Sequence, residues 1–212
     1  MNTKSFKAVA FSFAVMLVFA AAPAFGAGST QAPTGKALEL QEALRSLWLD
    51  HLFWARSVVL SSSNGDVEGA KMAEGHVVQN AKAIADAMVP FYGNEAGDKL
   101  FGLLAGHYGA VKAYTIAAFS NDKSGMEKAR NDLMTNGEEI AIFLSSANPN
   151  WPKETLDSLL MTHGAHHLVQ VEAIGRKDFS AEAVNWVSMK EHMNMIADAL
   201  AAGLAKQFPE KV

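Results

Sequence analysis

The hydrophobic positions of this chain form stripes that recur, without a gap, every 56 residues. The polar residues set between these stripes recur at the same interval. The aligned sets are Leu44/Leu100/Leu156, His51/His107/His163, Asp66/Asp122/Asp178, Asn80/Asn136/His192 and Ile84/Ile140/Ile196. A period of this size indicates one supersecondary unit that is used three times.

Each unit contains two amphipathic segments with apolar residues at i, i+3, i+4 and i+7, one around the histidine and one around the asparagine. Asn, Gly and Asp separate the two segments, and each aspartate is suited to cap the following helix. No segment has the alternation of a strand. The pattern predicts an all-α fold, a six-helix up-down bundle made of three helical hairpins with pseudo-threefold symmetry. The repeats run approximately over 41–96, 97–152 and 153–208, with turns near residues 65, 93, 121, 149 and 177.

The polar positions of the repeat are predicted to share one level of the bundle. The histidine and the asparagine of each unit lie about 14 residues from the same turn, which is about 22 Å along a helix. Both also fall within apolar stripes, so this layer should be buried. Segments that carry the repeated histidine contain fewer charged residues than the others, so they are expected to form the three inner helices.

Three imidazoles near a pseudo-threefold axis suggest a tri-histidine metal site, the arrangement of many zinc enzymes. His51, His107 and His163 are the predicted ligands, with His192 as a fourth, and their rings should approach one another more closely than those of His76, His166 and His192. Candidate ions are Zn, Cu, Ni or Mn. Asn80 and Asn136 are predicted cofactor-binding residues that orient the imidazoles. His163 and His167 lie one turn apart and have chelating spacing, although such a pair is often incidental.

A second interpretation of the same layer is architectural, because buried polar residues can fix the register of a bundle without any ligand. A third is a metal-dependent hydrolase or transferase, which needs an open coordination position. The chain has no Gly-rich phosphate loop, no Ser nucleophile elbow and no Cys–His pair. It therefore carries no catalytic signature, and binding of a metal ion or small molecule is favoured over enzymatic activity.

The first residues are predicted to direct export of the chain and not to form part of the folded domain. Lys4 and Lys7 precede an apolar run that ends in small residues, as in a signal peptide over 1–26, and a flexible leader is expected over 27–37. The remaining 38–212 is predicted to be a single helical domain in the periplasm or outside the cell. Loss of the two lysines changes the net charge from −4 to −6. An acidic surface argues against nucleic-acid and membrane partners; a protein partner is not predictable. The absence of cysteine means that no disulfide is needed.

Several motifs resemble a group of small all-helical bacterial proteins from Bacillus and Clostridium-type organisms. They are the LxxLWxxHxxWxR stretch from Leu44 to Arg56, Pro90–Gly93, IAxFLSSxNPxW from Ile140 to Trp151, and Gln207–Pro209. Some members are labelled kinase or glycosyltransferase, but the resemblance implies no established activity. It does imply the same five His and Asn positions, with an acidic residue at 192. A partial resemblance to DinB-type metal bundles covers one helix, through His163, His167 and Gln170.

Overall fold

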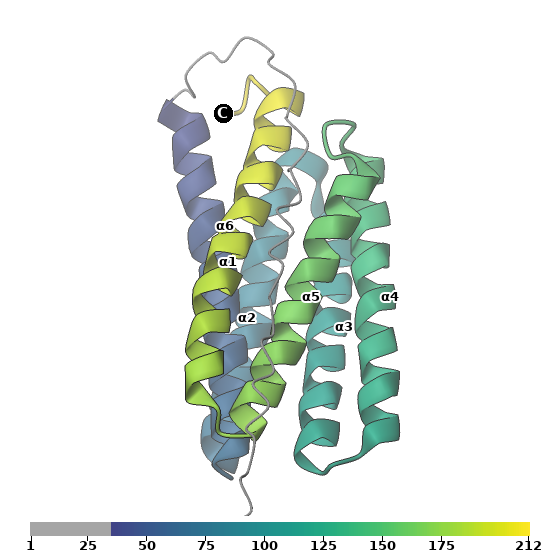
Figure 1. The fold of residues 1–212 in the computed structure, drawn as a ribbon. Helices are drawn as coiled ribbons and strands as arrows, with labels where there is room; N and C mark the ends of the chain where they lie inside the picture. Colours follow the sequence, from purple (N-terminus) through teal and green to yellow (C-terminus); the bar gives the residue numbers. More distant parts are fainter. Residues whose placement is uncertain (1–34) are drawn as a thin grey trace, which may run out of the picture. The chain divides into compact units, whose positions relative to one another are not determined.

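The computed structural model describes residues 35–212, and this part of the chain folds into six α-helices with no strand. The helices are α1 (Gly35–Ser63), α2 (Val67–Tyr92), α3 (Asn94–Phe119), α4 (Lys123–Ala147), α5 (Lys153–Gly175) and α6 (Phe179–Gln207) (Figure 1). The prediction of an all-α six-helix bundle is confirmed. The predicted signal peptide and residues 27–34 of the predicted leader lie outside the described residues. The last three leader residues are helical, because α1 begins at Gly35.

The turn inside each hairpin has the same construction. One residue with positive φ precedes an aspartate whose side chain caps the next helix. These turns are Gly65 (φ 72°), Asn121 (57°) and Lys177 (57°), and the cap bonds run from the amides of Gly69, Gly125 and Ala181 to Asp66, Asp122 and Asp178. Capping satisfies an amide that the first turn of a helix leaves without a partner. The dipeptides Gly65-Asp66, Asn121-Asp122 and Lys177-Asp178 therefore end one helix and begin the next.

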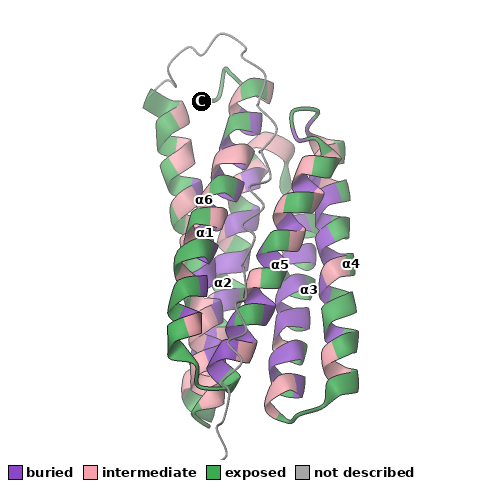
Figure 2. Cartoon of the chain, in the orientation of Figure 1, coloured by how far each residue is buried: buried purple, intermediate pink, exposed green. Residues whose placement is uncertain are grey.

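Consecutive helices pack against each other, and α6 packs against α1, so the six helices form a closed ring. Helices α1, α3 and α5 also contact one another, which makes them the inner helices, as their low charge predicts. Figure 2 shows α3 buried along most of its length, whereas α4 and α6 keep exposed faces. None of the described helices is long and apolar enough to span a membrane.

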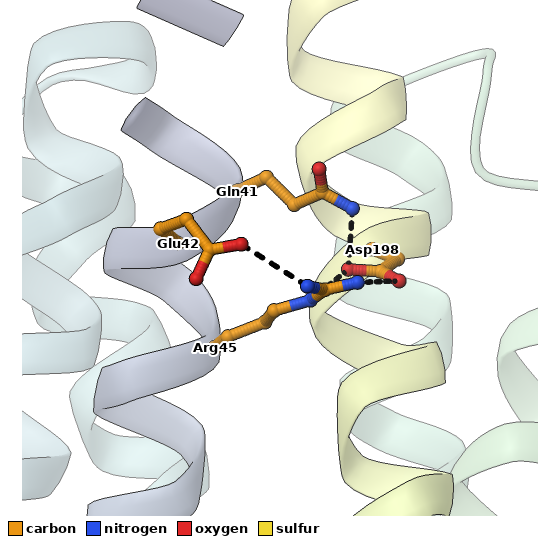
Figure 3. A network of polar contacts seen from close by, with 4 residues as sticks. All are labelled: Gln41, Glu42, Arg45 and Asp198. Carbon is orange, nitrogen blue, oxygen red and sulfur yellow. Dashed lines mark hydrogen bonds and ion pairs between the residues drawn. The ribbon is translucent and has the colours of Figure 1, made fainter. Parts of the chain in front are cut away.

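An ion pair joins the first helix to the last. Arg45 of α1 donates two hydrogen bonds to the carboxylate of Asp198 on α6, from Nε at 2.7 Å and from Nη2 at 2.8 Å. Gln41 donates to the same carboxylate at 2.7 Å, and Glu42 accepts from Arg45 at 3.1 Å (Figure 3). Such a bidentate pair fixes orientation as well as adding energy. It fixes the register with which α6 closes the ring.

Two of the three apolar clusters in the described part of the chain occupy different levels of the core. The larger gathers residues that precede the repeated histidines on the inner helices, such as Leu44, Leu100 and Leu156. The other gathers residues that follow them, such as Val59 and Val171. The level of the histidines thus lies between two close-packed apolar layers that exclude water.

Candidate metal centre

Four histidines from the inner helices meet at this level of the core. They are His51 of α1, His107 of α3, and His163 and His167 of α5, with exposed fractions of 5%, 3%, 2% and 1%. Each offers one ring nitrogen, and these nitrogens all lie within 4.8 Å of one another. The structure therefore brings together three of the predicted ligands, and the fourth histidine of this cluster is His167. We call these four residues the histidine cluster.

The rings of the histidine cluster are distributed like the ligands of a tetrahedral ion. The six distances between ring centroids are 4.6, 5.3, 5.7, 5.8, 5.9 and 6.3 Å. Four imidazoles on one tetrahedral ion, with metal–nitrogen bonds of about 2.0–2.1 Å, have centroids roughly 5 Å apart. In a square plane two of the six distances would stand apart as longer than the other four. The observed set shows no such division. To reach the tetrahedral value, the 6.3 Å pair would close by about 1.3 Å and the 4.6 Å pair would open slightly.

The pair on α5 already has the spacing of two metal ligands. Nε2 of His163 and Nε2 of His167 are hydrogen-bonded to each other at 3.2 Å. Two nitrogens bound to one tetrahedral zinc lie about 3.4 Å apart. Spacing of four residues on a helix places two imidazoles on one face, one turn apart, which is the chelating arrangement of helical zinc motifs.

Most ring nitrogens of the histidine cluster lack a hydrogen-bond partner within the described residues. Both nitrogens of His107, Nε2 of His51, Nδ1 of His163 and Nδ1 of His167 are buried and unpaired. A buried polar group without a partner costs about 1–3 kcal/mol. Native proteins keep few such groups, and those that persist call for a physical reason.

The four imidazoles are held in the neutral form. Burial, followed by the proximity of His107, lowers the pKa of His51 to about 3. Burial lowers the pKa of His107 to about 4, and the Asn136 side chain partly offsets this. The pKa values of His163 and His167 fall well below the ordinary value, first through burial and then through the neighbouring histidines. A neutral imidazole has a free lone pair, which is the form that binds metals.

The predicted ligand His192 lies outside the histidine cluster. Its Nε2 is 2.8 Å from the carbonyl oxygen of Leu159 on α5. The amides of Asn80 and Asn136 make the same bond, at 2.9 Å to Leu47 and 3.0 Å to Leu103. In all three cases an outer helix donates to an inner-helix carbonyl 33 residues earlier. His192 therefore replaces asparagine as a donor, and this bond holds its ring on the outer helix, away from the centre.

The prediction about ring distances is correct in one part and wrong in another. His51, His107 and His163 are buried and converge, as predicted. The rings of His166 and His192, however, lie 5.6 Å apart, which is closer than the 6.3 Å between His51 and His107. The reason is that α5 and α6 are neighbours and each presents one histidine to the other.

Asn80 and Asn136 stand next to the histidine cluster as partners of the backbone. Each donates its amide to a carbonyl four residues before a clustered histidine, and each leaves its Oδ1 buried without a partner. The Asn136 side chain lies beside His107 and opposes the lowering of its pKa by burial. These orphan oxygens are acceptors suited to the outer N–H of a metal-bound imidazole.

One buried charged group was not anticipated from the sequence. Glu182 of α6 is 2% exposed, and both its oxygens accept from Arg56, at 2.6 and 2.8 Å. Gln170 donates to it at 3.3 Å, and the Arg56 guanidinium lies 5.0 Å from the Trp186 ring. The pKa of Glu182 is lowered, chiefly by Arg56. Because Arg56 neutralises this carboxylate, it supplies no net negative charge to the core.

Comparison with protein-family models, curated proteins and solved structures finds no match for this chain. We therefore infer its function from the geometry of the described residues.

Proposed function

We propose that this protein is an exported helical bundle that binds one borderline divalent metal ion between His51, His107, His163 and His167. The observation that carries the proposal is the set of six distances between ring centroids, from 4.6 to 6.3 Å, each within about 1.3 Å of the value expected for a tetrahedral ion. Export is inferred from the charged and apolar start of the chain.

Metal binding accounts for the histidine cluster better than an architectural role does. A layer that serves only packing satisfies its own polar atoms, since each orphan nitrogen costs stability. Here five ring nitrogens of the histidine cluster are buried and unpaired. An ion at the centre would bind one nitrogen of each ring, which includes Nε2 of His51 and one nitrogen of His107, and would so offset part of that cost. The backbone bonds of Asn80 and Asn136 serve the architectural part, the register of outer against inner helices.

The ligand set favours zinc, copper or nickel. Neutral imidazole suits these borderline ions, whereas manganese prefers carboxylate, carbonyl and water oxygens. A tetrahedral arrangement suits zinc in particular, since zinc has no geometric preference of its own beyond ligand packing. Manganese is the least suitable of the four ions considered from the sequence.

A site of this composition holds its metal ion and does not use it in catalysis. A catalytic zinc keeps one position open for water or substrate, but four protein ligands fill a tetrahedron. The hydrolase or transferase alternative needs that open position, and His167 would occupy it. Storage, transport or structural use of the ion fits the four-imidazole arrangement.

We further infer that three hairpin repeats related by pseudo-threefold symmetry supply the frame. Support comes from contacts that recur every 56 residues, namely the three capped turns and the three bonds from Asn80, Asn136 and His192. His167 breaks this repeat, because its counterparts at the same interval are Ala55 and Val111. Three ligands thus come from one repeated position, and the fourth comes from the third repeat alone.

The test is metal analysis of the untagged chain purified from the cell envelope. We expect one tightly held zinc, copper or nickel ion per chain in the purified wild type and no tightly held ion in His107→Asn, which preserves size and polarity. His76→Gln is the matched control, because His76 stacks on Trp54 away from the histidine cluster, at 4.0 Å between centroids. A metal-free wild type that melts identically with and without added zinc, copper, nickel or manganese would refute the proposal.

A further inference from the structure

Two histidines outside the histidine cluster face each other at its edge. His166 of α5 and His192 of α6 are both partly exposed, and their ring centroids lie 5.6 Å apart. His166 directly precedes His167 on α5. We call these two residues the outer pair.

Hydrogen bonds fix the tautomer of each ring in the outer pair. Nε2 of His192 lies 2.8 Å from the Leu159 carbonyl, which only accepts, so Nε2 carries the proton and Nδ1 keeps its lone pair. Asn185 donates its amide to the backbone carbonyl of His166 at 3.1 Å, so its Oδ1 is turned to Nδ1 of His166 at 2.8 Å. Nδ1 of His166 therefore carries the proton, and Nε2 keeps its lone pair.

This is the arrangement that metal-binding histidines use. A ligating imidazole donates its other N–H to a carbonyl or carboxylate, which orients the ring and raises its basicity. No hydrogen bond occupies Nε2 of His166 or Nδ1 of His192 in the described part of the chain. The centroid distance of 5.6 Å is close to the roughly 5 Å that two imidazoles adopt on one tetrahedral ion.

We propose that His166 and His192 form a second, solvent-facing metal site, which captures a borderline divalent ion and supplies it to the histidine cluster. Two imidazoles leave positions for water, so this site binds more weakly and exchanges faster than a four-imidazole site. The capture role rests on the proposed function of the histidine cluster, whereas binding at the outer pair does not. The position supports the role, because His166 and His167 are consecutive residues and α5 thus supplies ligands to both sites.

The repeat offers a variant that removes the outer site without disturbing the fold. His192→Asn installs the residue that stands at 80 and 136, where the amide makes the same bond to a backbone carbonyl. His76→Gln again removes a histidine elsewhere. The probe is Zn²⁺ alone, added to chelator-stripped protein, with stoichiometry from equilibrium dialysis and loading rate from a competing zinc indicator.

We expect two zinc ions per chain in the wild type and in His76→Gln, one tight and one weaker. His192→Asn should retain the tight ion. Its affinity for the weaker ion should fall by at least about tenfold. Zinc should also enter the tight site of this variant more slowly. His107→Asn should keep only the weaker ion. A wild type with a single ion that survives in His192→Asn would overturn the second site, and an unchanged loading rate in that variant would overturn the capture role. A single weak ion that is lost in His192→Asn but kept in His107→Asn would instead refute the proposed function, and with it the capture role.

Discussion

Acidification of the metal-free protein should unfold it at a pH where most helical bundles are stable. The histidines of the cluster are buried neutral, and in the unfolded chain each has an ordinary pKa of about 6.5. In the folded chain the pKa of His51 is about 3 and that of His107 about 4. The unfolded state therefore binds more protons between these limits. Stability is fully present above about pH 6.5 and is lost as the pH falls toward the folded pKa values.

The magnitude follows from these pKa values. Lowering the pH from 7 to 5 costs about 2 kcal/mol of folding free energy for each imidazole that stays neutral in the fold. His51 and His107 together contribute about 4 kcal/mol, and His163 and His167 act in the same direction. Domains of this size are stable by about 5–15 kcal/mol. Most of that margin should be gone near pH 5.

The assay is urea unfolding, followed by circular dichroism, of chelator-treated protein at intervals between pH 7.5 and 4.5. The slope of the unfolding free energy against pH counts the protons taken up on unfolding. His107→Asn should lower that count by about one near pH 5, because it removes an imidazole that burial keeps neutral in the fold. A stability that stays level from pH 7 to 5, or a slope that His107→Asn does not reduce, would contradict neutral burial of these rings.

Three further outcomes are expected. Chelation should lower the melting temperature of metal-loaded protein, since an ion at 100–1,000 times its dissociation constant adds about 3–4 kcal/mol; calorimetry that finds no change would mean that no ion is bound. Glu182→Gln should cost about 3 kcal/mol in urea unfolding, because Arg56 is left without its counter-charge, while loss of the exposed Lys128–Asp132 pair should have little effect; equal effects would contradict the importance of burial. Lys177→Gly should stabilise the chain by about 1 kcal/mol, since φ is 57° there and glycine occupies the equivalent Gly65; no gain in thermal unfolding would mean that this turn is unstrained.

The helical fold could be predicted from the sequence because the helical periodicity, the helix caps and the turn residues all indicate the same helix boundaries. Helical stripes, aspartate caps and turn residues all recur at one interval, and the helices end where the Asn, Gly and Asp residues predict. Burial of His51, His107 and His163 followed from their places within apolar stripes. These properties depend on local spacing, which a sequence displays directly.

The composition of the candidate metal site was harder to predict, because it depends on helix rotation and on single hydrogen bonds. His163 and His167 have chelating spacing, but only the rotation of α5 turns both rings to the centre. His192 aligns with two asparagines, and a protonated imidazole nitrogen donates to a carbonyl as an amide does. The alignment alone does not say whether the free nitrogen then points inward or outward. The pairing of Glu182 with Arg56 joins residues 126 positions apart, beyond any local pattern.

The third hairpin carries the residues that distinguish a metal site from a repeated structural layer. A threefold set of imidazoles defines three corners of a tetrahedron and leaves the fourth corner on the axis, where no threefold repeat can place a single side chain. In the proposed metal site, His167 would fill that corner with a second ring from α5, one turn beyond His163. The same hairpin replaces the repeated asparagine by His192 and sets His166 opposite it. If the proposals hold, substitutions confined to the third hairpin should abolish selective metal handling while the capped turns and the backbone bonds of Asn80 and Asn136 keep the bundle folded.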